Sequence, residues 1–379
     1  MTRALPLARL RKTLRRQLAP GFVRAVFAYP QGADGAAEPE VVEGSGRPDE
    51  EALRALCDRA EAAARAGRVK QTFVLDAATR LRVDARHGTG KLQRIDADTV
   101  EKMMGGKDRT LRPDASADLL RHIGIMNPDG SISAKNAKKY KQINHFVELC
   151  RPVWTRLVAQ GGSDRPLRVF DLGCGNSYLS FVLAEALRLE GIPLRLVGVD
   201  RRDDVIERSR ARTEALGWEH LQFRAQSIGD LDLLELGGPP DLVVSLHACD
   251  TATDEALARA IQSGARAIFA APCCQHELAE QLRDAPVSAL VRHGLFKQDY
   301  AALLTDALRA ELVEAQGYRV DLLEFVASEH SAKNRLIRAF RHDGRTATAW
   351  AAIVARCREL GVHPRLLALL DESRAAASH

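Results

Sequence analysis

The chain has 379 residues, of which 46% are hydrophobic and 28% are charged, and its formal net charge is +5. This length favours two domains. Because no stretch approaches the ~18 consecutive apolar residues of a membrane span, a membrane protein is excluded and we expect no membrane partner. Seven cysteines without a secretory leader indicate a reducing, cytoplasmic compartment rather than a disulfide framework.

Residues 1–20 are expected to form a basic N-terminal arm. The first 24 residues contain seven basic side chains, whereas the first acidic residue is Asp34. Such an arm could contact nucleic-acid phosphates or target the chain to an organelle, although presequences are usually rich in serine and this segment has none. A third reading is that arginine is simply the preferred surface residue of this chain.

Residues 21–110 read as a small α+β domain. Its expected elements are strands at 21–30, 71–78 and 79–88, a helix at 49–66, a loop at 31–48 and a turn at 87–91. The helix is indicated by Leu53, Leu56 and Ala60 at helical spacing, and the loop by its content of Gly, Pro and Glu.

Residues 111–165 are expected to be a basic helical linker or cap. The helix is indicated by apolar residues at three- and four-residue spacing, namely Tyr140, Ile143, Phe146, Val147 and Cys150. Lys138, Lys139 and Gln142 lie off this stripe and face solvent or a ligand. A simple solvated helix face is the alternative.

Strands and helices alternate from residue 166 to residue 342, which predicts a parallel sheet covered by helices on both faces. The last two strands follow each other without an intervening helix and imply an antiparallel edge. The predicted fold class is therefore α/β, a doubly wound, seven-stranded, Rossmann-like sheet with the smaller N-terminal α+β domain. Residues 343–379 read as two short helices.

The sharpest motif is a buried strand that runs through Asp171 into the Gly-Cys-Gly turn at 173–175 and then into a helix. We expect this turn to expose backbone N–H groups at the carboxyl end of the sheet, beside a helix N-terminus. It departs from the dinucleotide fingerprint, because Tyr178 stands where a third glycine would be. Asp200 ends the next strand and is placed to accept both hydroxyls of a ribose.

A carboxylate, a short glycine turn and a ribose-binding acid suit a ligand with an amino-acid head and an adenosine. S-adenosylmethionine fits, since its ammonium group pairs with a carboxylate and needs no turn of the kind that binds a pyrophosphate. An α/β domain with a tight turn and no nucleotide is the alternative. Cys174, inside the turn, reads as a small filler rather than a reactive thiol.

Two further motifs, HACD at 247–250 and PCCQH at 272–276, follow neighbouring strands at the edge where such sheets bind ligands. They could hold a metal, although they lack the C-x₂-C pairs of structural zinc. Cys273 or Cys274 could attack a pyrimidine ring, or the segment could only position the acceptor atom in line with a methyl group. We favour positioning and expect no metal.

A last cluster comprises Glu329, His330, Lys333 and Asn334, in the turn between the final two strands. Loops at this position can close over substrate. A plain polar hairpin is the alternative.

Four segments in this order and spacing resemble the class I methyltransferases of the methyltransferase domain 32 group, namely 171–180, 247–257, 272–278 and 329–339. The resemblance covers about residues 134–342. It implies methyl transfer from S-adenosylmethionine, as in methyltransferase-like protein 25 and a eukaryotic tRNA 2′-O-methyltransferase of the same group. A strand domain stands here where the tRNA enzyme has a Cys/His zinc-finger region, so the acceptor atom stays open.

The resemblance also implies residue roles: 247–250 line the methionine side of the cofactor, Lys139 and Gln142 cap the site, and 272–276 face the acceptor. The predicted cofactor-binding residues are Asp171, Gly173, Cys174, Gly175, Asp200, Ser227, His247, Asp250, Lys139 and Gln142. The predicted catalytic residues are Pro272, Cys273, Cys274 and His276, and the predicted substrate-binding residues are Lys138, Glu329, Lys333 and Asn334.

We therefore expect an S-adenosylmethionine-dependent methyltransferase that acts on RNA, either tRNA or rRNA. The basic arm and the lysine-rich helix would contact phosphates without reading sequence. A protein methyltransferase and a non-catalytic, cofactor-binding module are the alternatives. The sequence indicates no oligomeric state.

Overall fold

The computed structural model describes residues 5–29, 39–76, 79–85, 89–95, 109–127, 130–161, 165–246, 248–272, 274–282, 288–324, 335–342 and 347–376. The chain divides into two compact units, Met1–Tyr140 and Lys141–His379. No helix of the described residues is long and apolar enough to cross a membrane.

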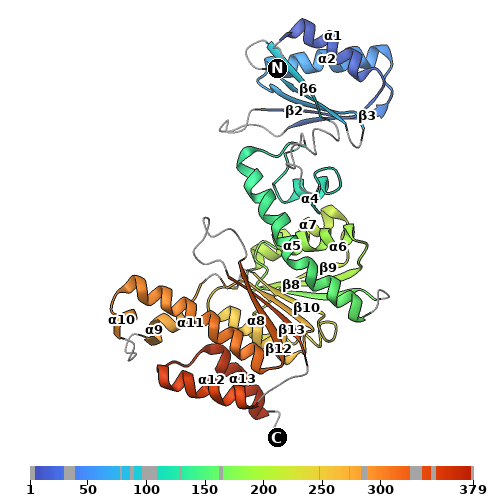
Figure 1. The fold of residues 1–379 in the computed structure, drawn as a ribbon. Helices are drawn as coiled ribbons and strands as arrows, with labels where there is room; N and C mark the ends of the chain where they lie inside the picture. Colours follow the sequence, from blue (N-terminus) through green and yellow to red (C-terminus); the bar gives the residue numbers. More distant parts are fainter. Residues whose placement is uncertain are drawn as a thin grey trace. The chain divides into compact units, whose positions relative to one another are not determined.

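The first unit contains a six-stranded antiparallel sheet in the order β1-β6-β5-β4-β2-β3. Its elements are β1 (Leu5–Pro6), α1 (Leu7–Leu18), β2 (Phe22–Ala28), β3 (Glu40–Gly46), α2 (Glu50–Arg65), β4 (Lys70–Val74), β5 (Arg80–Asp84), β6 (Thr89–Ile95) and α4 (Ala117–His122). Helices α1 and α2 lie side by side along this sheet (Figure 1). The predicted small α+β domain is confirmed.

The core of this unit lies between the two helices and the sheet. Leu14 and Leu18 of α1 and Leu56 of α2 are buried in one cluster with Phe27 and Phe73 of the sheet. Burying a leucine or phenylalanine side chain contributes about 1.5–3 kcal/mol, so these contacts hold α1 against the sheet.

Three expectations about this unit are wrong. The loop expected at 31–48 contains β3, and the turn expected at 87–91 contains the start of β6. Both strands carry glycines, which weaken strand propensity, but neighbouring strands supply the ladder hydrogen bonds. Most of the segment expected as a basic arm is helix α1, because its leucines repeat at helical spacing between the arginines.

The second unit holds the larger sheet and most of the helices. Its elements are α5 (Ala134–Gly161, which begins in the first unit), β7 (Leu167–Leu172), α6 (Tyr178–Leu189), β8 (Leu194–Asp200), α7 (Asp203–Leu216), β9 (Leu221–Ala225), η2 (Ile228–Asp230), β10 (Leu242–Ser245), α8 (Thr251–Gln262), β11 (Ala267–Ala270), α9 (Glu277–Gln281), α10 (Ser288–Val291), α11 (Gly294–Ala315), β12 (Tyr318–Glu324), β13 (Arg335–Arg341), α12 (Ala347–Leu360) and α13 (Arg365–Ala376).

The strand order is β12-β13-β11-β10-β7-β8-β9, and β13 is antiparallel to both of its neighbours. The doubly wound, seven-stranded sheet is thus confirmed. In the expected edge pair, the antiparallel strand is β13, which lies between β12 and β11 and not at the edge of the sheet. The edge strand β12 therefore runs parallel to every strand of the sheet except β13. Chain order reverses between β7 and β10, which is where open α/β sheets bind ligands.

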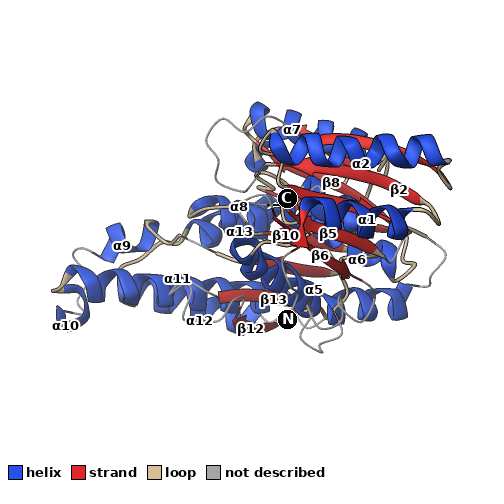
Figure 2. Ribbon diagram, turned by 90° about the horizontal axis from the view of Figure 1, so that it is seen from above, coloured by secondary structure: helices blue, strands red, loops and turns tan. Residues whose placement is uncertain are grey.

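Helices cover both faces of this sheet (Figures 1 and 2). On one face, Phe146 of α5 meets Phe269 of β11 edge to face, and Phe181 of α6 stacks on Phe223 of β9. On the other face, residues of α8, α11, α12 and α13 form one buried cluster with the sheet. Strands β10 and β11 are buried at every position, as expected of parallel strands between two helical layers.

Candidate active site

The turn between β7 and α6 packs directly against the loop after β10. Gly173 has a φ of +76°, and a Cβ at this position would lie 3.1 Å from the Cβ of Ala248. Both the left-handed backbone and the close approach require glycine. The turn and the HACD loop are therefore neighbours at the point where the strand order reverses.

The N–H groups of this turn face the protein. The amides of Gly173 and Cys174 both donate to the carbonyl of Val199, at 2.8 and 2.9 Å. The amide of Gly175 donates to Oδ2 of Asp200 at 2.8 Å. The expectation of exposed N–H groups is wrong for these three amides, because β8 ends beside the turn and supplies their acceptors.

Asp171 is the buried carboxylate of the site, with 3% of its surface exposed. Its Oδ2 accepts a hydrogen bond from the hydroxyl of Ser180, whereas its Oδ1 has no hydrogen-bond partner among the described residues. Burial, and secondarily the charge of Asp200, raise the pKa of Asp171 to about 7 although the Ser180 hydroxyl lowers it. A cationic ligand group would stabilise the ionised form and satisfy Oδ1.

Asp200 stands at the carboxyl end of β8, as predicted. Its Oδ2 accepts the amide of Gly175, and its Oδ1 accepts the amide of Arg202 at 3.0 Å and Nε of Arg202 at 3.3 Å. A carboxylate has about four acceptor positions, so one lone pair remains, on Oδ2, for a ligand hydroxyl. Ser227, also predicted, is exposed after the neighbouring strand β9.

Cys174 is fully buried beneath the turn. The Ser177 hydroxyl donates a hydrogen bond to its Sγ at 3.2 Å and accepts one from the Ser209 hydroxyl at 2.8 Å. Burial raises the pKa of the Cys174 thiol well above its ordinary value. A buried, protonated thiol is a poor nucleophile, which matches the expected filler role.

Asp250 joins the two cysteine-containing motifs. Its Oδ1 accepts the amides of His276 and Glu277 at 2.8 and 3.2 Å, and its carbonyl accepts Nη2 of Arg309 at 2.9 Å. Asp250 also has a φ of +52°, a conformation that non-glycine residues adopt only when their surroundings hold it. The carboxylate predicted to contact the cofactor thus ties the HACD turn to the start of α9.

Beneath these loops lies a buried polar network that the sequence did not predict. Arg309 of α11, 2% exposed, donates from Nε and Nη2 to Asp254 of α8 at 2.9 and 2.6 Å. Asp306 accepts from Nη1 of Arg335 at 2.6 Å and from the side-chain amide of Gln275 at 3.2 Å. The signal available in the sequence was a set of charges inside the apolar pattern of α8 and α11.

The PCCQH motif at 272–276 follows the carboxyl end of β11 in the chain. Pro272 and Gln275 are buried, Cys274 is half-buried and His276 is exposed. Cys273 lies outside the described residues, as do His247, Glu329, Lys333 and Asn334. No group of three metal-ligating side chains occurs among the residues that the structure describes.

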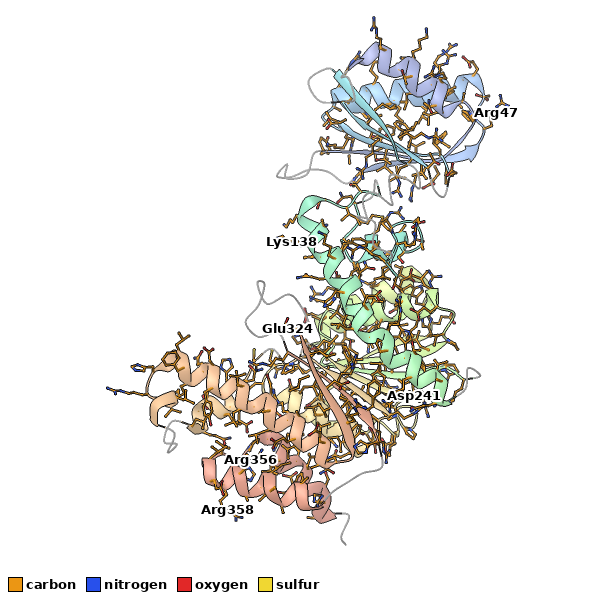
Figure 3. All side chains as sticks on the ribbon, in the orientation of Figure 1. Arg47, Lys138, Asp241, Glu324, Arg356 and Arg358 are labelled. Carbon is orange, nitrogen blue, oxygen red and sulfur yellow. The ribbon has the colours of Figure 1, made fainter. Side chains whose placement is uncertain are left out.

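Three predicted residues lie on α5. Lys138 and Lys139 belong to the first unit and Gln142 to the second. All three are exposed, and Lys138 projects from the helix (Figure 3). Their capping and substrate-binding roles stay predictions.

Comparison with known proteins gives one family match. Residues 138–281 match the family model described as a methyltransferase domain. No curated protein matches the chain. The second unit therefore carries a methyltransferase domain.

The chain is also similar to solved methyltransferases. A Podospora anserina methyltransferase solved with SAH is 16% identical, with a TM-score of 0.38 over 65% of this chain and 97% of its own. The magnesium protoporphyrin IX methyltransferase of Synechocystis, also solved with SAH, is 18% identical, with a TM-score of 0.32 over 62% of this chain and 97% of its own. A ribosomal protein L11 methylase from Lactobacillus delbrueckii is 12% identical, with a TM-score of 0.31 over 50% of this chain and 77% of its own. At TM-scores this low, these likenesses establish no shared activity.

Proposed function

We propose that this methyltransferase transfers the methyl group of S-adenosylmethionine to RNA, either tRNA or rRNA, in the cytoplasm. The observation that carries the cofactor assignment is the buried Asp171, whose Oδ1 has no partner among the described residues. An amino-acid ammonium is the ligand group that such an oxygen prefers.

The residues at the turn fit this cofactor. Asp171 would hold the ammonium, and Asp200 would accept a ribose hydroxyl with its remaining lone pair. A Cβ on Gly173 would lie 3.1 Å from the Cβ of Ala248, so the glycine lets the turn pack closely against the HACD loop. The cofactor would supply an electrophilic methyl group, and the protein would hold the amino-acid end and the ribose of the cofactor.

Residues 272–276 are proposed to position the acceptor. Asp250 fixes the backbone at His276 and Glu277, and Asp306 fixes the side chain of Gln275. Holding the acceptor atom in line with the methyl group lowers the barrier to its direct attack, and no nucleophilic side chain of the protein is needed. A covalent route through Cys273 or Cys274 is the second candidate for the mechanism.

RNA as the substrate is supported by charge. Lys138, Lys139 and Lys141 are exposed in succession on α5, where cations can contact phosphates without reading sequence. A base acceptor would have to be extruded or already unpaired. The kinship with methyltransferase-like protein 25 and the tRNA 2′-O-methyltransferase is part of this proposal and rests on the shared motifs.

The test is mass spectrometry of nucleosides from RNA of cells with and without the gene, complemented by the wild type or by Asp171→Asn. We expect one methylated nucleoside to disappear and to return only with the wild type. Unchanged nucleosides together with a methylated protein in the wild type alone would establish a protein methyltransferase instead. S-adenosylmethionine binding in calorimetry without any methylated RNA or protein would establish the non-catalytic, cofactor-binding module.

A further inference from the structure

The arginines of the first unit fall into two groups, those that pair with a carboxylate of the unit and those that do not. On the helical layer, Arg11 of α1 pairs with Asp58, and Arg15 pairs with Glu50. These charges are neutralised within the unit. Arg16 and Arg47 are exposed and form no ion pair with any described carboxylate, and Arg94 donates a hydrogen bond to the side chain of Gln17 at 3.4 Å.

Arg16, Arg47 and Arg94 surround one hollow of about 540 Å³. They come from three elements, the last turn of α1, the residue after β3 and the strand β6. Arg47 reaches outward at the rim of the sheet (Figure 3). The volume lies within the range of ligand-binding sites, about 300–1,000 Å³, and exceeds what a single phosphate fills.

The electrostatic balance of the hollow is positive. Asp76 is the acidic residue of its lining, and its Oδ1 accepts the amide of Thr79 at 2.7 Å. The C-terminal end of α1 adds roughly half a negative charge. Three guanidinium groups outweigh both contributions, and their planar donor forks match phosphate oxygens.

The backbone leaves room for a chain to approach. Gly21 and Gly46 have φ values of +140° and +100°, and a Cβ on Gly46 would meet nothing within 4 Å. The aromatic residue of the lining, Phe22, is only 9% exposed, so it offers no platform for base stacking. The hollow therefore suits a sugar-phosphate backbone rather than a base.

We propose that this hollow binds the phosphodiester backbone of RNA and anchors the substrate independently of its sequence. The inference rests on the proposed function, in which RNA is the substrate. Three phosphate contacts with single-stranded RNA contribute about 2 to the slope of log affinity against log salt concentration. Removing the three arginines should remove that contribution.

The experiment measures binding of the full chain to a labelled single-stranded RNA between 50 and 200 mM salt. The test variant is Arg16→Gln/Arg47→Gln/Arg94→Gln. The control variant, Arg54→Gln/Arg59→Gln/Arg65→Gln, removes the same charge from exposed positions of α2 in the same unit, outside the hollow. We expect the test variant to bind about 10- to 100-fold more weakly at 100 mM salt, with a slope smaller by about 2, and the control to stay within about threefold of the wild type.

Equal weakening of both variants, or wild-type affinity in the test variant, would overturn the inference. Binding of a poly-glutamate peptide through these arginines, with no binding of RNA, would also overturn the inference. The proposed function fails separately, if the chain binds RNA through the hollow but methylates none. Conversely, RNA methylation with an unchanged affinity of the test variant leaves the proposed function intact and removes the anchor. Equal circular dichroism melting curves of the three proteins exclude unfolding as the cause.

Discussion

Replacement of Asp171 by asparagine should stabilise the fold while weakening the cofactor site. The folded protein raises the pKa of Asp171 from 3.8 to about 7, chiefly through burial. Between these values the folded state holds a proton that the unfolded chain releases. The stability due to this group is therefore greatest below pH 4, falls as the pH rises towards 7, and stays low above it.

The size of the effect follows from the shift. About three pKa units correspond to about 4 kcal/mol of unfolding free energy, which is an upper bound because water and side chains adjust around a buried charge. Asparagine is neutral at every pH and lacks this cost. Asp171→Asn should match the wild type near pH 4 and exceed its unfolding free energy at pH 8 by several kcal/mol, at most about 4.

Urea unfolding at pH 4, 6 and 8 measures this difference, and calorimetry with S-adenosylmethionine measures binding. Losing a charge-assisted hydrogen bond, about 1.5–3 kcal/mol, should weaken binding of the variant about 10- to 100-fold at pH 7.5. Wild-type affinity should fall about tenfold for each pH unit below 7. Ser180→Ala removes the donor to Oδ2 and should move that transition to higher pH. A variant that is destabilised equally at pH 4 and pH 8 would refute the electrostatic reasoning.

Four other substitutions test the remaining steps. Arg309→Met leaves buried carboxylates without their cation and should lower the unfolding free energy by about 3–5 kcal/mol; a loss below about 1 kcal/mol in urea titration would contradict a buried network. Gly173→Ala forces a side chain into the 3.1 Å gap beside Ala248 at a φ of +76°, so it should cost at least about 1 kcal/mol and lower cofactor affinity in calorimetry, and unchanged values of both would show that the turn adapts. Cys273→Ala and Cys274→Ala should each keep most methyl transfer if the segment only positions the acceptor; abolished activity, with a covalent adduct to fluoropyrimidine RNA in the wild type, would establish the covalent route.

Local patterns predicted the methyltransferase sheet well. Strands such as β11 are apolar throughout because both of their faces are buried, and Ile143, Phe146 and Val147 repeat on α5 because one face of that helix is buried. Asp171 and Asp200 could be placed because each follows from where its own strand ends. These features depend on residues close together in the chain.

The features that the sequence did not predict depend on distant partners. Arg309 and Asp254 are 55 residues apart, and no local pattern relates their charges. The amide of Gly173 faces inward because the carbonyl of Val199, on another strand, lies beside it. The hollow of the first unit likewise joins Arg16, Arg47 and Arg94 from three separate elements.

Two buried aspartates of the second unit, Asp241 and Asp171, differ in whether arginine side chains neutralise their charge. Asp241, labelled in Figure 3, is completely buried between Arg165 and Arg266, at 2.6 and 2.9 Å. Burial alone would raise its pKa, but hydrogen bonds from the two guanidinium groups and from the amide of Arg168 lower it below the usual value. Asp171 is as well buried but forms no ion pair with a described cation, and its pKa is raised to about 7. The fold thus neutralises Asp241 with two arginines and leaves Asp171 without a described cation at the glycine turn, where we propose that the ammonium of the cofactor supplies the positive charge.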